Sequence, residues 1–202
     1  MSEWREAVWA AVPEDAVPER FEERRDWLLG FVSPGDRVLD LGCGDGSFAE
    51  ALVEAGAKVT MADVAEGALE RARRRVPDAE AVLLEEDARL PFADDSFDLV
   101  WCGETLEHVA DASGLAAETR RVLRPGGTLL VTVPNQPRVR VAFDSLAGRP
   151  LEDRLDPRSD HLRFFTPRTL DALLGGAGFR SVEVSAAGGL PGFRRALRAV
   201  AR

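Results

Sequence analysis

The sequence of 202 residues has few of the side chains that form covalent cross-links or metal sites. It contains two cysteines, two histidines and no tyrosine. The isolated Cys43 and Cys102 form neither a disulfide framework nor a C-x-x-C metal motif, so we expect both to be small buried hydrophobic residues. The lack of tyrosine excludes a phenolic catalytic base. No cluster of His, Cys and carboxylate residues is evident, and we expect no metal site.

Long hydrophobic runs and an excess of positive charge are also missing. No apolar stretch approaches the roughly 20 residues of a membrane-spanning helix. The charged N-terminus, Met1 to Glu6, lacks the apolar core of a signal peptide. The formal net charge of −9 is unfavourable for contact with nucleic-acid phosphates. We therefore expect a cytoplasmic protein with no membrane span and no nucleic-acid partner.

The chain is organised around a glycine-rich stretch that directly follows a short apolar run at residues 37–41. The stretch reads Asp40-Leu41-Gly42-Cys43-Gly44-Asp45-Gly46 and leads into a helical pattern. A strand, a tight turn and a helix in this order let backbone N–H groups approach a ligand, because glycine has no Cβ. Asp40 would repel a pyrophosphate at this turn but would suit an ammonium or sulfonium group.

Strand and helix patterns alternate along the rest of the chain. Apolar runs predict strands at 37–41, 58–62, 79–84, 96–102, 128–133 and 179–185, and helical patterns predict helices at 47–55, 66–75, 113–123 and 167–177. This alternation predicts an α/β fold with a doubly wound, mostly parallel sheet and helices on both faces. Two further helices are predicted at 4–12 and 21–31. Both either cover an edge of the core or, in the case of the first segment, form a lid over a ligand site.

Chemically active residues recur where the predicted strands end. Ligands bind beyond the carboxyl ends of parallel strands, so we expect these residues to surround one site. Asp63, 17 positions after Gly46, can accept hydrogen bonds from both hydroxyls of a ribose. The alternative is that Asp63 caps the helix that follows it. The strand-end residues are Asp40, Gly42, Asp63, Asp87, Cys102 and Glu104.

The stretch from Asp40 to Gly46 resembles the first motif of class I S-adenosylmethionine-dependent methyltransferases. Its glycine spacing and its acidic residue differ from the dinucleotide fingerprint G-x-G-x-x-G. The segment from Leu90 to Val100 resembles the L-P-F-x-D-x-S-F-D-x-V pattern of small-molecule methyltransferases of the ubiquinone and menaquinone biosynthesis type. With Leu123-Arg124-Pro125-Gly126-Gly127, the resemblance covers about residues 36 to 180.

The resemblance implies S-adenosylmethionine as cofactor and a small-molecule acceptor with an O, N or C nucleophile. It places adenine at Asp87 and Ala88, and the ammonium group of the ligand at the carbonyl groups of Cys102 and Gly42. A nicotinamide-dependent oxidoreductase and a non-catalytic S-adenosylmethionine-binding protein are the alternatives. The complete set of expected cofactor contacts is Asp40, Gly42, Cys43, Gly44, Gly46, Asp63, Val64, Asp87, Ala88, Cys102 and Glu104.

The two histidines are the candidate catalytic residues. His108 follows the fourth predicted strand and could remove a proton from an acceptor hydroxyl, since imidazole titrates near neutral pH. The alternative is a structural histidine bonded to nearby backbone. His161 lies in a segment that resembles the acceptor border of quinone-type enzymes, and it is equally open to a structural role. Asp160 could orient the His161 ring.

We expect a single methyltransferase domain over residues 1–202. It comprises N-terminal helices (1–33), a cofactor-binding core (34–133), a lid (134–167), and a C-terminal helix, strand and tail (168–202). The lid is a proline- and arginine-rich connection, and connections of this length are usually functional or disordered. The tail from Phe193 to Arg202 has the pattern of a short basic amphipathic helix. The antiparallel strand that normally completes the methyltransferase fold is not evident in the sequence.

Overall fold

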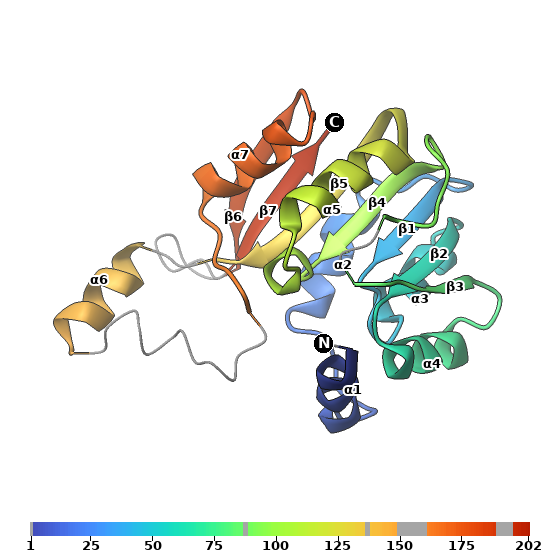
Figure 1. Ribbon diagram of the computed structural model, residues 1–202, viewed down its shortest axis with the longest axis horizontal. Helices are drawn as coiled ribbons and strands as arrows, with labels where there is room; N and C mark the ends of the chain where they lie inside the picture. The colour runs from blue at the N-terminus through green and yellow to red at the C-terminus, as the bar shows by residue number, and fades with distance from the viewer. Residues whose placement is uncertain (1, 87–88, 136–137, 149–160, 189–195) are drawn as a thin grey trace.

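The computed structural model describes residues 2–86, 89–135, 138–148, 161–188 and 196–202. Within these residues, seven strands form one sheet in the order β3-β2-β1-β4-β5-β7-β6 (Figure 1). The strands β3 (Glu80–Leu83), β2 (Lys58–Asp63), β1 (Arg37–Leu41), β4 (Phe97–Gly103) and β5 (Leu123–Pro134) are parallel to one another. The order reverses between β1 and β4, as in doubly wound folds. The predicted fold class is confirmed.

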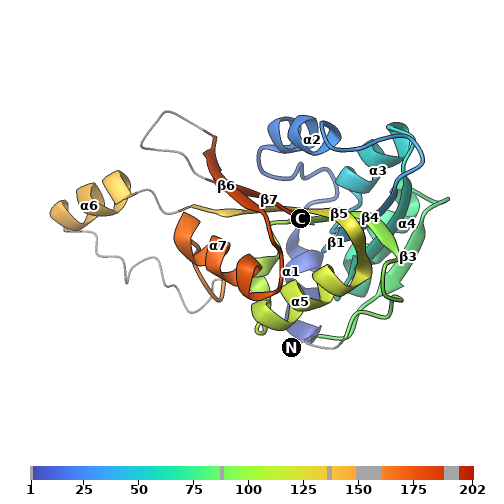
Figure 2. The same ribbon diagram turned by 90° about the horizontal axis from the view of Figure 1, so that it is seen from above.

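Helices cover both faces of the sheet (Figure 2). The helices α2 (Phe21–Leu29), α3 (Ser47–Glu54) and α4 (Glu66–Arg75) enclose one core, and α5 (Ala112–Val122) and α7 (Pro167–Gly176) enclose the other. Val38 and Trp101 belong to the first core, whereas Leu39 and Val100 belong to the second. Adjacent strand residues therefore point to opposite faces, and both faces are apolar because both are covered.

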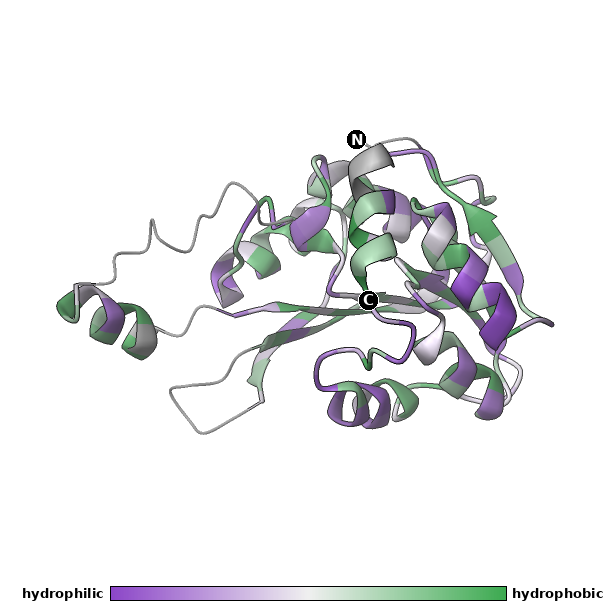
Figure 3. Cartoon of the chain, turned by 90° about the horizontal axis from the view of Figure 1, so that it is seen from below, coloured by the Kyte–Doolittle hydropathy of each residue, from purple (hydrophilic) through white to green (hydrophobic). Residues whose placement is uncertain are grey.

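Three other elements lie outside these layers. The helix α1 (Ser2–Ala11) packs against α4, and the 3₁₀ helix η1 (Leu106–His108) follows β4. The helix α6 (Arg138–Leu146) stands apart from the sheet and carries exposed Val139, Phe143 and Leu146 (Figure 3). The sequence analysis did not predict α6 within the expected lid, of which residues 136–137 and 149–160 lie outside the described part.

No helix in the described residues is long and apolar enough to span a bilayer.

The C-terminal tail is a strand, and the predicted tail helix is wrong. The strand β7 (Ala196–Ala201) runs antiparallel between β5 and β6 (Val182–Ala187) and is the completing strand that the sequence did not reveal. Leu197 and Ala199 enter the core beneath α5 and α7, while Arg198 on the opposite face bonds to Glu23 of α2. Pairing along both edges of β7 outweighs the intrinsic helix preference of its alanine and leucine residues.

The turn between β1 and α3 has the backbone conformation for which glycine is suited. Gly42, Gly44 and Gly46 have φ values of +77°, +55° and +82°, a region that residues with a Cβ avoid. The turn is also crowded: a Cβ on Gly46 would lie 2.9 Å from the Cα of Ala72 in α4. The absence of a Cβ at Gly46 therefore lets α4 pack closely against the turn.

We predict that Leu197→Ala lowers the free energy of unfolding by about 2–5 kcal/mol, as buried leucine truncations do. Leu197 is fully buried in β7, so the substitution leaves a cavity between two sheet neighbours and α7. Chemical denaturation measures the change, with Val17→Ala at an exposed loop position as the matched control. A change within about 0.5 kcal/mol, typical of surface sites, would mean that the tail is not part of the sheet.

Candidate functional site

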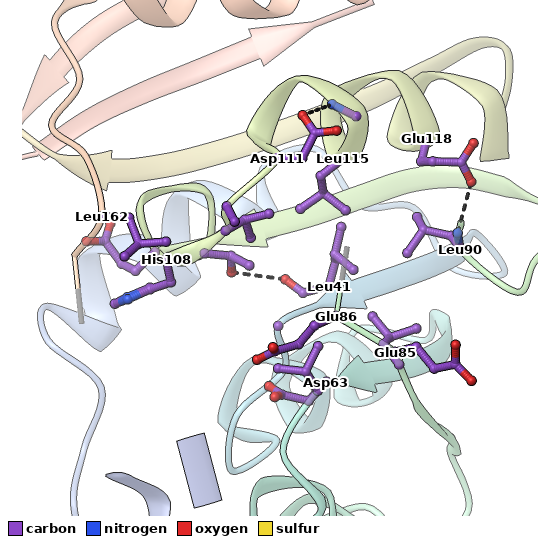
Figure 4. Close-up of a pocket in the computed structure, with 18 of the residues that line it drawn as sticks. Leu41, Asp63, Glu85, Glu86, Leu90, His108, Asp111, Leu115, Glu118 and Leu162 are labelled. Carbon is purple, nitrogen blue, oxygen red and sulfur yellow. Dashed lines mark hydrogen bonds between the residues drawn. The ribbon is translucent and has the colours of Figure 1, made fainter. Parts of the chain in front are cut away.

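A pocket of about 600 Å³ opens at the carboxyl ends of β1, β2 and β4 (Figure 4). Leu41 and Gly42 contribute from the end of β1, Asp63 from the end of β2, and Glu104 from the loop after β4. The volume is within the range of sites for small molecules and cofactors. The position coincides with the reversal of strand order, where doubly wound sheets bind ligands.

The pocket wall includes four of the expected cofactor contacts, namely Gly42, Asp63, Val64 and Glu104. Asp87 and Ala88 lie outside the described residues. The other five, which do not line the described pocket, are Asp40, Cys43, Gly44, Gly46 and Cys102.

The two cysteines are buried and free of disulfides, as expected. Burial raises the pKa of the Cys102 thiol to about 12, with a further contribution from Glu107. Burial also raises the pKa of the Cys43 thiol well above its ordinary value. Both side chains are therefore neutral thiols that act as small apolar residues.

The Asp63 carboxylate joins the glycine-rich turn to the segment after β2. Oδ2 accepts a hydrogen bond from the N–H of Gly44, and Oδ1 accepts one from the N–H of Ala65, both at 3.0 Å. The N-cap residue of α4 is Ala65, so Asp63 is not the helix cap considered above. These bonds hold the carboxylate at the pocket wall, beside Glu86 in Figure 4.

Glu6 of α1 accepts hydrogen bonds from free backbone N–H groups at the N-terminus of α4. The sequence analysis did not predict this contact. Its carboxylate accepts from the N–H groups of Glu66 (2.6 Å) and Gly67 (3.0 Å), and an acidic group is favourable at a helix N-terminus. At the other end of α1, Arg71 of α4 donates to the carbonyl groups of Trp9 (3.1 Å) and Val12 (2.8 Å).

These bonds hold α1 beside the pocket, where Val8, Trp9 and Val12 form part of the wall. The Trp9 ring also lies against the glycine-rich turn, since a Cβ on Gly44 would be 2.9 Å from it. The position of α1 therefore fits the interpretation of the first N-terminal helix as a lid over the ligand site. The core-cover interpretation fits α2, whose Leu28 is fully buried.

The loop after β4 presents Glu104 to the pocket. Glu104 has φ +58°, which is uncommon for a residue with a side chain. The next residue, Thr105, donates through Oγ1 to the carbonyl of Leu41 (3.2 Å) and packs over Gly42. Among the described residues, Glu104 Oε1 is buried without a hydrogen-bond partner. An acceptor in this state is available to a donor group of a ligand.

The pocket wall is strongly acidic. Asp63 has the backbone bonds described above, Glu118 pairs with Arg121 at 2.6 Å, and Asp111 accepts from the N–H of Gly114 at the start of α5. Against these carboxylates, the described residues of the wall include one arginine, Arg89. A cationic ligand is therefore favoured over an anionic one. The carboxylates of the wall are Asp63, Glu85, Glu86, Glu104, Asp111 and Glu118.

Asp40 lies in β1 next to this wall, with only 2% of its surface exposed. Burial and the neighbouring carboxylate of Asp63 raise the pKa of Asp40 to about 8, while Arg24 acts in the opposite direction. Asp40 is therefore largely protonated at neutral pH. A cation in the pocket would favour its ionised form.

The fold brings the two histidines together. The ring centroids of His108 and His161 are 4.8 Å apart, and Nε2 of His108 is 3.9 Å from Oε1 of Glu107. The N–H of Leu162 donates to the carbonyl of Glu107 (2.8 Å), which fastens the His161 segment to η1. Asp160 lies outside the described residues, and the acid found beside the histidines is Glu107.

One potential ligand atom from each of Glu107, His108 and His161 lies within 4.8 Å of the others. The sequence analysis found no such cluster, because His161 is distant from the other two along the chain. Imidazole and carboxylate groups suit several divalent metal ions, and they also suit proton transfer.

Comparisons with known proteins identify the family of this chain. Residues 39–131 match the family model described as "Methyltransferase domain". The chain is 34% identical over 172 residues to the ubiquinone biosynthesis O-methyltransferase of Xanthomonas campestris pv. campestris (strain B100), a match that covers 80% of this chain and 70% of that protein.

The chain is also 41% identical over 123 residues to methyltransferase GfsG of Streptomyces halstedii, covering 58% of this chain but only 42% of that protein. A solved S-adenosylmethionine-dependent methyltransferase from Archaeoglobus fulgidus shares the fold, with a TM-score of 0.70 and 17% identity over 91% of this chain and 93% of that one. The Xanthomonas relative and the family model show that this chain belongs to the methyltransferase-domain family of S-adenosylmethionine-dependent methyltransferases.

Proposed function

We propose that the protein transfers a methyl group from S-adenosylmethionine to an O, N or C nucleophile of a small molecule. The observation that carries this proposal is the acidic pocket formed by Asp63 and Glu104 around the turn at Gly42. S-adenosylmethionine presents an ammonium and a sulfonium group, which this pocket would attract. The name of the Xanthomonas relative, an O-methyltransferase of ubiquinone biosynthesis, supports a small acceptor.

The residues of the pocket fit the cofactor. The carboxylate oxygens of Asp63 each have acceptor capacity beyond their present backbone bonds and would receive the ribose hydroxyls. Glu104 Oε1, buried and without a partner in the described structure, would receive the ammonium group. Leu90 and Leu115, which line the same pocket, offer apolar surface for a base, and Asp87 and Ala88 remain the proposed adenine contacts.

The alternatives fit the pocket less well. A dinucleotide would bring its pyrophosphate to the turn beside Asp63 and Glu104, where the acidic pocket wall would repel it. A non-catalytic S-adenosylmethionine-binding protein would use the same pocket, because a conserved fold does not guarantee turnover. Only a turnover experiment separates that alternative from the proposed enzyme.

S-adenosylmethionine, when bound, supplies a methyl group that is already activated on its sulfur. The residues of the chain would position the acceptor and exclude water, with Trp9 of α1 closing one side. The cluster of Glu107, His108 and His161 borders the pocket through His108. It would take the proton of an acceptor hydroxyl, or hold a divalent cation that makes the hydroxyl more acidic.

The cofactor is tested by calorimetric titration with S-adenosylhomocysteine, with NAD as a parallel ligand. We expect S-adenosylhomocysteine alone to bind the native protein. Asp63→Ala should weaken this binding by about 1.5–3 kcal/mol, the scale of hydrogen bonds to a charged group. Asp78→Ala, at an exposed turn outside the pocket wall, is the matched control. Binding of NAD alone, or an unchanged affinity in folded Asp63→Ala, would contradict the assignment.

The histidine cluster is tested by turnover on a panel of small phenols, amines and activated carbon acids, with S-adenosylhomocysteine formation as the readout. His108→Ala and His161→Ala should each lower kcat by about 10²–10⁴, the usual contribution of acid–base catalysis, without changing the affinity for S-adenosylhomocysteine. The control Arg163→Ala lies in the same segment and bonds to a backbone carbonyl.

A chelator separates the two roles of the cluster. Loss of turnover with EDTA and recovery with Mg²⁺, Mn²⁺ or Zn²⁺ would assign the cluster to a cation, whereas insensitivity would assign it to proton transfer. Cofactor binding without turnover on the entire panel would favour the non-catalytic alternative.

A further inference from the structure

Thr105 connects the loop after β4 to the end of β1 through its side chain. Its hydroxyl lies 3.2 Å from the carbonyl oxygen of Leu41, the bond drawn as a dashed line at Leu41 in Figure 4, and 3.4 Å from the carbonyl oxygen of Gly103. A hydroxyl has one hydrogen to donate, and the shorter contact joins segments that are 64 residues apart in the sequence. This bond therefore holds the loop against the glycine-rich turn.

The Thr105 side chain also packs directly on the backbone of the turn. A Cβ on Gly42 would lie 2.5 Å from Oγ1 and 2.8 Å from Cγ2 of Thr105, so the threonine occupies the space that a side chain at Gly42 would need. Both residues line the pocket. The threonine therefore fixes the loop at the place where a ligand meets the turn.

Glu104, the residue before Thr105, has a backbone conformation that needs such support. Its φ of +58° lies in the left-handed region, which is unfavourable for a residue with a side chain and persists only where the surroundings hold it. The N–H of Glu104 donates to the carbonyl of Thr132 in β5 at 2.8 Å. The Thr105 hydroxyl bonds to β1 on the other side, so Glu104 is held between β5 and β1.

The chain beyond Thr105 is anchored without the threonine side chain. The N–H of His108 donates to the backbone carbonyl of Thr105 at 3.0 Å, and Leu106 is only 2% exposed. Neither contact involves the hydroxyl. Loss of the hydroxyl should therefore affect Glu104 and the end of β1 and leave η1 in place.

The conformation of Glu104 places a carboxylate oxygen where a ligand could use it. Oε1 is buried and has no hydrogen-bond partner among the described residues. A buried acceptor left free in this way is unfavourable, and a donor from a ligand would compensate. An acceptor that is already fixed gives more net binding free energy than one that must be ordered on binding. In the proposed function this oxygen receives the ammonium group.

We propose that Thr105 is a positioning residue for the ammonium end of the cofactor site. Its hydroxyl, bonded to the carbonyl of Leu41, keeps Glu104 in the left-handed conformation with Oε1 available to the ligand. Thr105 acts through Glu104 on the amino-acid part of the ligand and not on its adenosine part. This inference rests on the proposed function.

The experiment compares two ligands that differ in the amino-acid part. S-adenosylhomocysteine carries the ammonium group, whereas methylthioadenosine has the same adenosine and thioether without it. Thr105→Val keeps the branched shape and removes the hydroxyl. By calorimetric titration, Thr105→Val should lose about tenfold in affinity for S-adenosylhomocysteine, the scale of one buried hydrogen bond, and keep its affinity for methylthioadenosine.

Two further variants serve as controls. Thr105→Ser retains the hydroxyl and should recover most of the affinity for S-adenosylhomocysteine. Thr60→Val makes the same change in β2, outside the wall of this pocket, where the hydroxyl bonds to Glu80 at 3.3 Å. It should leave the affinity for both ligands unchanged.

A double-mutant cycle shows whether Thr105 acts through Glu104. Glu104→Gln should by itself weaken the binding of S-adenosylhomocysteine. Adding Thr105→Val to Glu104→Gln should weaken it by less than about twofold more, because the group that the threonine positions is already lost. The same loss from Thr105→Val in both backgrounds would show independent action and would overturn the inference.

The remaining outcomes are distinct. An equal loss of affinity for both ligands in Thr105→Val, or no loss for S-adenosylhomocysteine, would overturn the inference and leave the proposed methyl transfer intact. An unchanged affinity for S-adenosylhomocysteine in Glu104→Gln would also overturn it. No binding of S-adenosylhomocysteine by the native protein would overturn the proposed function itself. If Thr105→Val does not fold, Thr105→Ala takes its place, since its smaller side chain relieves crowding at Gly42.

Discussion

The constraint on which this structure depends is the convergence of carboxylates where β1, β2 and β4 end. Parallel pairing places the ends of these strands side by side, so acids that are distant in sequence share one poorly solvated region. Asp40 shows the consequence: its folded pKa of about 8 is far above the ordinary 3.8. The carboxyl group favours folding most below its ordinary pKa, and this contribution is lost as pH rises toward 8. A bound cation would offset that electrostatic penalty.

Several acids in and around the pocket also stabilise the fold. Glu6 caps α4, Asp111 caps α5, and Glu118 pairs with Arg121. Glu6 and Asp111 accept short hydrogen bonds from backbone N–H groups, and only Glu118 of these three is paired with a positive charge. Glu104, by contrast, retains a buried oxygen without a partner in the described structure. This division explains how one pocket can be acidic and still belong to a stable domain.

Local patterns predicted much of the fold and part of the site. The glycine-rich turn, Asp63 and Glu104 were identifiable because strand ends and glycine spacing are local signals. β7 was missed because its alanines and leucine favour a helix until β5 and β6 supply pairing partners. Glu107 was missed as a partner of the histidines because its position beside His161 depends on the packing of η1 against a distant segment.

The sequence by itself determined the order of the strands from β1 to β6 and of the helices between them apart from α6, the conformation of the glycine turn, and the acids at the strand ends. It did so because hydrophobic period, glycine positions and strand ends are properties of neighbouring residues. Only the tertiary structure decided which carboxylates have hydrogen-bond partners, that α1 lines the pocket, and that the two histidines meet. These relations depend on burial and on distances between remote segments, which set the strength of electrostatic interactions and have no local signature in the chain.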